Sequence, residues 1–272
     1  MRGIILAGGS GSRLYPLTRI TNKHLLPVYD RPMVYFAVEA LVVAGIDRIL
    51  VVTGGNHAGE FLPLLGNGSQ FGLRHLDYTF QERAGGIAEA LGLARHFASG
   101  EPVCVMLADN VYERSIRPSV EAFLRDGRGA RVLLAEVEHP EHYGVPVFNG
   151  GRIIRIEEKP NVPASRFATT GCYLYDEGVF DIIKTITPSG RGELEITDVN
   201  NRYLDRGELE HDVIDGYWAD CGESIASYYR AIRLVAEHGA NQASDPAESR
   251  QSGLPHTGVG PDGGRSDDKR TK

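Results

Sequence analysis

The sequence predicts an α/β fold of the doubly wound type, in which helices cover both faces of a mixed sheet. Three observations predict it. Short, fully apolar runs, typical of strands buried on both faces, occur at residues 4–7, 49–52 and 103–108. Apolar residues at helical spacing lie between these runs, as at residues 33–44. From residue 140 onward the alternation of strand and helix gives way to shorter strands and a hairpin.

The first half of the chain alternates strand and helix. The helix at residues 33–44 is favoured by Pro32 at its start and Gly45 at its end. With the strands at 4–7 and 49–52 it forms a βαβ unit, whose crossover we expect to be right-handed. The further elements that we expect are helices at 58–65, 87–97 and 116–125 and strands at 73–80, 103–108 and 131–137.

The second half begins with a predicted hairpin. Two apolar runs within residues 140–156 flank Gly150 and Gly151, and a glycine pair between such runs is typical of a hairpin turn. The elements expected after it are strands at 169–175, 209–214 and 217–219 and helices at 179–184, 196–204 and 225–238.

The end of the chain differs in composition from the rest. Residues 240–272 lack aromatic side chains and are rich in glycine, proline and serine. Such a segment buries too little apolar surface to offset the entropy lost on ordering. We therefore expect one domain over residues 1–238 and a disordered, low-complexity tail over residues 239–272.

Composition argues against several classes of protein. The net charge of the 272 residues is −7, whereas a nucleic-acid binder usually presents a basic face, so we expect no nucleic-acid partner. The three cysteines lie far apart and form no CxxC, which argues against disulfides and zinc–thiolate sites and favours a reducing compartment. No apolar run approaches the roughly 18 residues that span a bilayer. With no leader at the N-terminus, we expect a cytoplasmic protein without a membrane partner.

The glycine-rich loop after the first strand is a candidate phosphate site. Gly8, Gly9 and Gly11 remove Cβ atoms where the chain turns, so that a phosphate can approach the backbone N–H groups. Arg13 adds a fixed cation that can grip phosphate oxygens. A tight turn followed by a solvated arginine is the alternative for this stretch alone. A dinucleotide fingerprint is excluded by Leu14 at the third glycine position, and a P-loop by the absence of GK[ST].

Two carboxylates and two lysines could complete such a site. Asp109 and Asp220 each follow a predicted strand, and two carboxylates from different strands commonly hold Mg²⁺ against phosphates. For Asp109 alone, a helix cap or turn is the alternative. Lys159 at the hairpin end and Lys23 in a proline-flanked loop are point charges suited to phosphate, or else solvated surface charges. Nucleotidyl transfer requires such cations around the phosphorus and an in-line nucleophile.

Other reactive side chains we interpret as structural or solvated. His139 and His142 lie around Pro140 in a loop and show no metal-ligand spacing. Cys221 has no histidine near it in sequence and is interpreted as a packed residue. Residues 191–195, which carry alternating charges before a predicted helix, are interpreted as a capping and charge-pairing segment.

These motifs, in this order, resemble the sugar-1-phosphate nucleotidylyltransferases and, among them, the glucose-1-phosphate thymidylyltransferases. The resemblance covers roughly residues 1–236. It rests on GGSGSRLYPLT at 8–18, KHLLPVYD at 23–30, LGNGS at 65–69, ADN at 108–110, YGV at 143–145, EEKP at 157–160, RGELEITD at 191–198 and WAD at 218–220.

The resemblance implies a fold and a reaction. The fold is a Rossmann-like, doubly wound nucleotide-binding core with an inserted sugar-binding subregion. The reaction is a Mg²⁺-assisted, in-line attack of glucose 1-phosphate on the α-phosphorus of dTTP, giving dTDP-glucose and pyrophosphate. UTP in place of dTTP, another hexose 1-phosphate, and a non-catalytic sensor of sugar nucleotides are the alternatives. A homo-oligomer, dimer or tetramer, is expected.

The resemblance also implies a role for each matching residue. Arg13 and Lys23 would steady the departing pyrophosphate, and Lys159 would hold the sugar phosphate. The implied nucleotide-binding residues are Leu6, Ala7, Gly8, Gly9, Ser10, Gly11, Ser12, Arg13, Gln81 and Gly86, the last two at the thymine edge. The implied sugar-binding residues are Asn110, Tyr143, Gly144, Glu158, Lys159, Thr169 and Trp218, and the implied metal ligands are Asp109 and Asp220. The chain departs from the common pattern at His24, where these enzymes often have Gln, and at Thr169, where Val is common.

Overall fold

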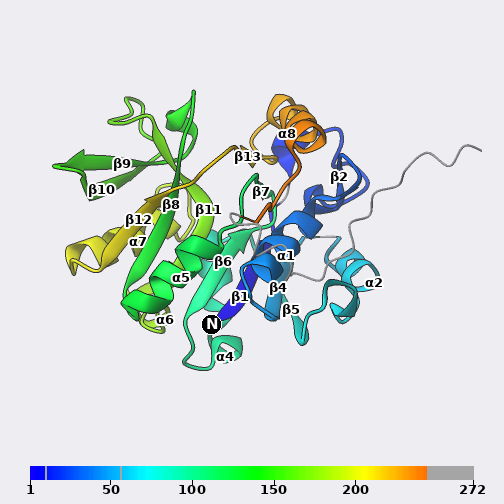
Figure 1. Cartoon of the computed structure of the whole chain (residues 1–272), viewed down its shortest axis with the longest axis horizontal. Coiled ribbons are helices and arrows are strands. Elements are labelled where there is room, and N and C mark those ends of the chain that lie inside the picture. The colour runs from blue at the N-terminus through cyan, green and yellow to red at the C-terminus, as the bar shows by residue number, and fades with distance from the viewer. Residues whose placement is uncertain (10, 56, 244–272) are drawn as a thin grey trace, which may run out of the picture.

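A mixed sheet of seven strands forms the centre of the computed structural model, which describes residues 1–9, 11–55 and 57–243. The strands of this sheet are β1 (Arg2–Ala7), β4 (Arg48–Gly54), β5 (His75–Gln81), β6 (Val103–Leu107), β8 (Ala130–Glu136), β11 (Phe167–Tyr175) and β12 (Leu209–Val213). Their spatial order is β12-β8-β11-β6-β1-β4-β5 (Figure 1). β6, β1, β4 and β5 run parallel, as does β12 beside β8, and β11 is antiparallel to both of its neighbours. The predicted mixed sheet is confirmed.

Both faces of the sheet are covered, as a doubly wound fold requires. In β1, Ile4 and Leu6 join the core on one face, while Ile5 and Ala7 join the core on the other. Residues of α3 (Ile87–Gly92), α4 (Arg95–Ala98), α6 (Val179–Ile183) and α7 (Ile196–Asp205) pack on the first face. Residues of α1 (Met33–Val43), α2 (Phe61–Leu65) and α5 (Arg117–Asp126) pack on the second. The uninterrupted apolar run of β1 follows from this burial on two sides.

The hairpin stands apart from the main sheet. β9 (Gly144–Asn149) and β10 (Arg152–Glu158) form a two-stranded antiparallel sheet of their own, at one end of the molecule (Figure 1). Gly150 and Gly151 form its turn with φ of 57° and 80°, which glycine adopts without steric cost. The predicted hairpin is confirmed. β10 packs against α7 and β9 against β11, so both strands of the hairpin are fixed to the domain.

Two details differ from the expected elements. The helix expected at residues 87–97 is divided into α3 and α4, because Gly92 and the turn after it interrupt the helical hydrogen bonds. Three further strands were not expected: β2 (Pro27–Val28), β3 (Arg31–Pro32) and β7 (Asn110–Tyr112). β7 pairs with β13 (Trp218–Asp220), which is distant in sequence, and β2 pairs with β3.

The last described helix closes the domain. α8 (Ile225–His238) begins at Ser224, whose side chain accepts a hydrogen bond from the Ser227 backbone N–H. The chain then packs back on the domain, since the Asn241 side chain donates to the Phe36 carbonyl at 2.9 Å. Residues 244–272 of the expected tail lie outside the described residues. No helix within the described ranges is both long and apolar enough to cross a membrane.

Candidate active site

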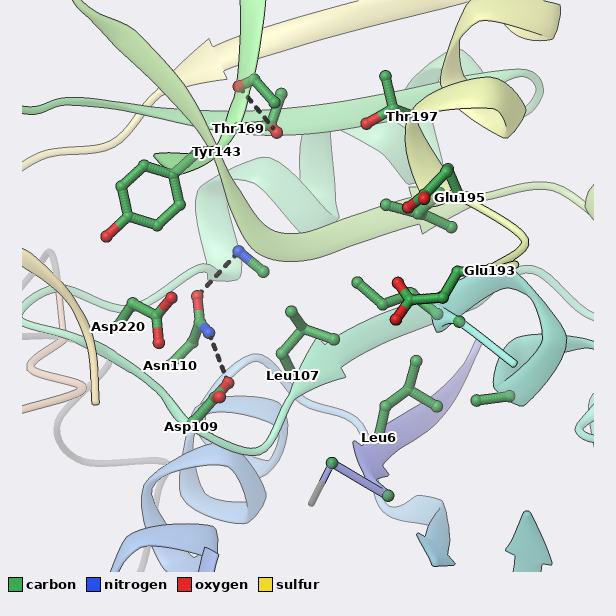
Figure 2. Close-up of a pocket in the computed structure, with 18 of the residues that line it drawn as sticks. Leu6, Leu107, Asp109, Asn110, Tyr143, Thr169, Glu193, Glu195, Thr197 and Asp220 are labelled. Atoms are coloured by element: carbon green, nitrogen blue, oxygen red, sulfur yellow. Dashed lines mark hydrogen bonds between the residues drawn. The ribbon is translucent and has the colours of Figure 1, made fainter. Parts of the chain in front are cut away.

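The pocket of interest lies where strand order reverses. β1 pairs with β4, the next strand of the main sheet along the chain, on one side and with β6 on the other, where Leu6 is in register with Leu107. The loops that follow β1 and β6 therefore start next to each other, at the carboxyl edge where open α/β sheets bind ligands. A pocket of about 300 Å³ opens there, and Figure 2 shows Leu6 and Leu107 at its floor.

Most of the predicted site residues line this one pocket. They are Leu6, Gly8, Gly9, Arg13, Lys23, Gln81, Gly86, Asp109, Asn110, Tyr143, Gly144, Glu158, Lys159, Thr169, Trp218 and Asp220. Among the described residues, the predicted nucleotide ligands Ala7, Gly11 and Ser12 do not line it. Ser10 lies outside the described residues.

The glycines of the loop have separate tasks. A Cβ at Gly8 would lie 2.8 Å from Oε1 of Gln81, so that this side chain can lie across the loop only if Gly8 is bare. Gly11 has a φ of 67°, and the Thr18 hydroxyl donates to its carbonyl at 2.9 Å. Gly11 thus makes the turn that presents the exposed Arg13 to the pocket, which explains why it is needed although it does not line the pocket.

The two carboxylates meet through the unexpected pair of β7 and β13. This pair sets Asp220 opposite Asn110, the residue after Asp109. The Lys23 ammonium donates to Asp109 Oδ2 at 2.5 Å, and both side chains are about nine-tenths buried. Lys23 reaches this position from a short 3₁₀ turn, η2 (Lys23–Leu25), which the Asn22 side chain caps.

The electrostatics of the pair are asymmetric. Burial, followed by the charge of Asp109, raises the pKa of Asp220 to about 7. Burial also acts upward on Asp109, but the Lys23 ammonium outweighs it and holds the pKa of this carboxyl far below its usual range. Burial acts downward on Lys23, yet Asp109 and Asp220 together raise its pKa. The site thus stabilises a cation between two acids.

This donor set fits a magnesium ion. Carboxylate oxygens are the protein ligands that Mg²⁺ prefers, and the mutual repulsion of two buried carboxylates is relieved by a divalent cation. No group of three or more His, Cys, Asp or Glu side chains with metal-binding geometry occurs within the described part of the chain. The remaining ligands would then come from water and from the phosphates of a substrate, as is common for Mg²⁺.

Asn110 connects the carboxylate to the surrounding strands. Its Nδ2 donates to Asp109 Oδ1 at 3.0 Å (Figure 2). Its Oδ1 accepts from Trp218 Nε1 at 2.6 Å and from the Gly171 N–H at 2.8 Å. The residue is only 2% exposed, so these bonds fix the orientation of Asp109. Asn110 is therefore a positioning residue in this structure; its expected contact with a sugar stays a prediction.

The far end of the pocket is formed by the hairpin and the start of α7. Lys159 follows β10 with a φ of 45°, and its N–H donates to the Tyr143 carbonyl at 2.9 Å. This left-handed conformation is uncommon for a residue with a side chain and is held here by that hydrogen bond. The Tyr143 ring packs edge-on against Trp218, with ring centroids 5.1 Å apart. Aromatic surfaces of this kind suit the apolar face of a sugar.

Sequence reasoning missed several residues at this end. Arg191, Glu193, Glu195 and Thr197 line the pocket, and Figure 2 shows the Glu193 carboxylate directed into it. The Thr197 hydroxyl donates to Glu158 Oε2 at 2.6 Å.

The charge pairing expected of residues 191–195 is confirmed, because Arg191 donates to Glu195 and to Glu158. No side-chain cap was found at α7, and the segment's place in the pocket was not foreseen. The RGELEITD motif at 191–198, one of the motifs that carry the family resemblance, could have indicated that these residues belong to the site.

Two other pocket residues were also interpreted differently. His142 is exposed, as expected, but it also lines the pocket, with Nδ1 3.3 Å from the Glu223 carboxylate. Tyr173 is 4% exposed and lines the pocket from β11, where it was expected only as a strand residue. Both lie beside predicted ligands, but neither carried a motif of its own.

His24 lies under the glycine loop in a neutral state. Its backbone N–H donates to Asn22 Oδ1 at 3.0 Å, and its Nδ1 lies 2.8 Å from the same oxygen. Burial and the neighbouring Lys23 charge lower the pKa of His24 to about 3, although a hydrogen bond to the Ala7 backbone acts upward. His24 thus joins η2 to the end of β1 without adding charge to the pocket.

Comparisons with known proteins find relatives that cover most of the chain. The glucose-1-phosphate thymidylyltransferase of an Actinoplanes species is 46% identical over 86% of this chain and 78% of its own length. That of Neisseria meningitidis is 43% identical over 86% of this chain and 84% of its own. A Bacillus anthracis protein assigned as a glucose-1-phosphate thymidylyltransferase, solved with sucrose, has a TM-score of 0.82 and 50% identity and covers 86% of this chain and 94% of its own.

A more distant structure supports the fold alone. A UDP-glucose pyrophosphorylase in complex with UDP-glucose, 23% identical, has a TM-score of 0.75 over 87% of this chain and 98% of its own. The family described as nucleotidyl transferase matches residues 2–238, which is nearly all of the described part of the chain. The chain belongs to the nucleotidyl transferase family.

Proposed function

We propose that this protein is a glucose-1-phosphate thymidylyltransferase, which makes dTDP-glucose and pyrophosphate from dTTP and glucose 1-phosphate. The observation that carries the proposal is the content of one pocket. It combines a glycine loop with an arginine, two buried carboxylates from different strands, and a lysine at the end of a separate hairpin. The names of relatives more than 40% identical support the choice of dTTP and glucose 1-phosphate.

The nucleotide half is formed by β1, β5 and the loops after them. Gly8 and Gly9 leave room for the triphosphate, and Arg13 and Lys23 supply charge to the two phosphates that leave. Gln81 would read the thymine edge with its amide, which already donates to the Gly86 carbonyl at 3.3 Å. This hydrogen bond fixes the orientation of the Gln81 amide that a base would meet.

The sugar half is formed by the hairpin, β11 and α7. Lys159 would hold the phosphate of glucose 1-phosphate, since an ammonium is a compact point charge. Glu158 would accept from sugar hydroxyls, and its orientation is fixed by Thr197 and Arg191. Tyr143, Gly144, Thr169 and Trp218 line the same end. A Cβ at Gly144 would lie 2.6 Å from the Thr169 hydroxyl, so this approach requires glycine.

The chemistry requires positioning more than covalent participation. A phosphate oxygen of glucose 1-phosphate attacks the α-phosphorus of dTTP in line, and the bond to the bridging oxygen of the β-phosphate breaks. The nucleophile is already anionic, so no general base is needed. Lys159 aligns it, while Arg13 and Lys23 stabilise the charge on the pyrophosphate. A magnesium ion on Asp109 and Asp220 would neutralise the charge around the α-phosphorus.

A panel of nucleotides and sugar phosphates tests this function. Purified protein is incubated with Mg²⁺ and each pairing of dTTP or UTP with glucose 1-phosphate or another hexose 1-phosphate, and pyrophosphate release is measured. We expect the highest kcat/KM for dTTP with glucose 1-phosphate. A preference for UTP would change the donor, and tight nucleotide binding without pyrophosphate would identify a sensor instead of an enzyme.

A further inference from the structure

Asp109 has no free oxygen atom in this structure. Its Oδ1 accepts from Asn110 Nδ2 at 3.0 Å, and its Oδ2 accepts from the Lys23 ammonium at 2.5 Å. The residue is 7% exposed, so water has little access to either oxygen. Any metal ion on Asp109 must therefore share an oxygen with one of these donors or displace it.

Sharing Oδ2 would place two cations close together. A magnesium ion lies about 2.1 Å from its oxygen ligands. With the ammonium 2.5 Å from the same atom, the two cations would be less than about 5 Å apart in a buried site, where repulsion is weakly screened. Displacement of Lys23 is the alternative that avoids this repulsion.

The chain after β13 lies close to the ion pair of Lys23 and Asp109. A Cβ at Gly222, two residues after Asp220, would lie 2.3 Å from Asp109 Oδ2 and 2.6 Å from Lys23 Nζ. The backbone after β13 thus lies close to the ion pair on one side. Asp220 Oδ1 is itself occupied by the Gly222 N–H at 2.8 Å. Lys23 must leave this position for metal to use Oδ2.

A second position for the ammonium lies along the glycine loop. A Cβ at Gly9 would lie 3.2 Å from Cε and 3.4 Å from Nζ of Lys23, so the end of the lysine side chain lies next to this loop. The four-carbon stem of lysine can redirect its ammonium by rotating side-chain bonds alone. The phosphates of a bound nucleotide would offer it a new anionic partner there.

We infer that Lys23 and the divalent metal ion compete for Asp109, and that Lys23 moves to the nucleotide phosphates when the metal binds. The inference rests on the proposed function, because it takes Asp109 as a metal ligand. Metal alone then binds weakly, since it must strip Asp109 from a buried lysine. Metal and nucleotide bind cooperatively, because the metal takes the place of Lys23 on Asp109 and the nucleotide phosphates give the displaced ammonium a new anionic partner.

Mn²⁺ binding without nucleotide tests this competition. Free Mn²⁺ is measured by electron paramagnetic resonance during titration of the wild-type protein and the variants Lys23→Met, Lys159→Met and Asp109→Asn. We expect K23M to bind Mn²⁺ about tenfold more tightly than wild type or more, the size of a typical coupling between two sites. K159M, which removes a pocket lysine that makes no contact with Asp109, should bind as wild type does. D109N should bind Mn²⁺ more weakly than wild type does.

The outcomes separate the inference from the proposed function. If K23M binds Mn²⁺ no more tightly than wild type while D109N weakens binding, the competition is wrong and the metal site stands. If D109N leaves Mn²⁺ affinity unchanged, the competition and the metal assignment are both wrong. Thermal melting of each variant establishes that it is folded.

A measurement on the wild-type protein does not depend on any variant. The Lys23 side chain is 11% exposed, against 39% for Lys159 and 63% for Lys184, so in ¹⁵N-lysine-labelled protein it should give the most slowly exchanging ammonium signal of these three described lysines. We expect saturating Mg²⁺ to shift this signal and hasten its exchange with water. An unchanged signal at Mg²⁺ concentrations that displace bound Mn²⁺ would overturn the inference.

Discussion

Asn110 and Asp220 face each other across the antiparallel pair of β7 and β13. Because Asn110 follows Asp109 directly, this pairing brings together two carboxylates that are far apart in the sequence. The Asn110 side chain then fixes Asp109 through its own amide at 3.0 Å. The geometry of the acid pair thus depends on short strands of three residues each.

Replacing Asp109 with Asn should reduce kcat by about 100-fold or more, because the proposed metal site loses one of its two anionic ligands and with it the cation that offsets the negative charge of the transition state. The variant keeps the shape of the side chain, and unchanged circular dichroism would show that the fold is intact. Pyrophosphate release measures the effect. Activity within a fewfold of wild type would remove Asp109 from the metal site.

Replacing Gly171 with Ala should destabilise the protein by about 1–3 kcal/mol and lower its activity. A Cβ there would lie 2.6 Å from Oδ1 of the buried Asn110, which cannot yield without releasing Asp109 or Trp218. Thermal and urea unfolding measure the change. Gly190→Ala is the matched control, since a Cβ at Gly190 meets nothing within 4 Å. Equal effects of the two substitutions would contradict this account.

Replacing Lys159 with Met should lower kcat/KM for glucose 1-phosphate by about 10- to 100-fold, the loss expected for one charge-assisted bond. The KM for dTTP should change little, because Lys159 lies at the hairpin end of the pocket. Steady-state kinetics with each substrate varied in turn separate the two. Lys184→Met, which removes a surface lysine paired with Asp181, should leave both constants unchanged. An equal rise in KM for dTTP would argue against the sugar-phosphate role.

His24 should make the fold sensitive to acid. Burial and Lys23 lower its pKa in the folded protein to about 3, whereas the unfolded chain takes up a proton below about 6.5. Stability linked to His24 is therefore complete above pH 6.5 and is lost progressively toward pH 3, at up to about 1.4 kcal/mol per pH unit. Between pH 7 and pH 5, wild type should lose about 2 kcal/mol more than the variant His24→Gln. Urea unfolding at several pH values measures this difference, and identical pH slopes for the two proteins would refute it.

Much of the fold follows from local patterns, and the rest from long-range pairing. The apolar run of β1 and the glycine pair at Gly150 and Gly151 each encode their own structure, because burial and turn geometry act over a few residues. β7 could not be predicted from its three residues, since its partner β13 lies more than a hundred positions away. Its strand conformation is imposed by tertiary pairing.

The site was foreseen where a residue type has few other uses. Bare glycines, Arg13 and carboxylates after apolar strands are distinctive, and nearly all of them line the pocket. Arg191 and Thr197 were missed because charged residues before a helix and hydroxyl residues in its first turn are common for structural reasons. Gly11 shows the reverse case, in which a motif residue forms the turn and not the lining.

β11 links the wall of the pocket to the integrity of the domain. The strand lies inside the main sheet between β6 and β8, yet Thr169, Gly171 and Tyr173 on it line the pocket. Its pairing with β8 shifts register between Thr169 and Tyr173, so the ladder is irregular where the strand passes the pocket. A variant that widens the pocket through β11 should also weaken the core. The hairpin pairs only with itself in the described sheets, but Ile153 and Ile156 on it belong to the main core, so only its pocket-facing residues can vary without the same cost to folding.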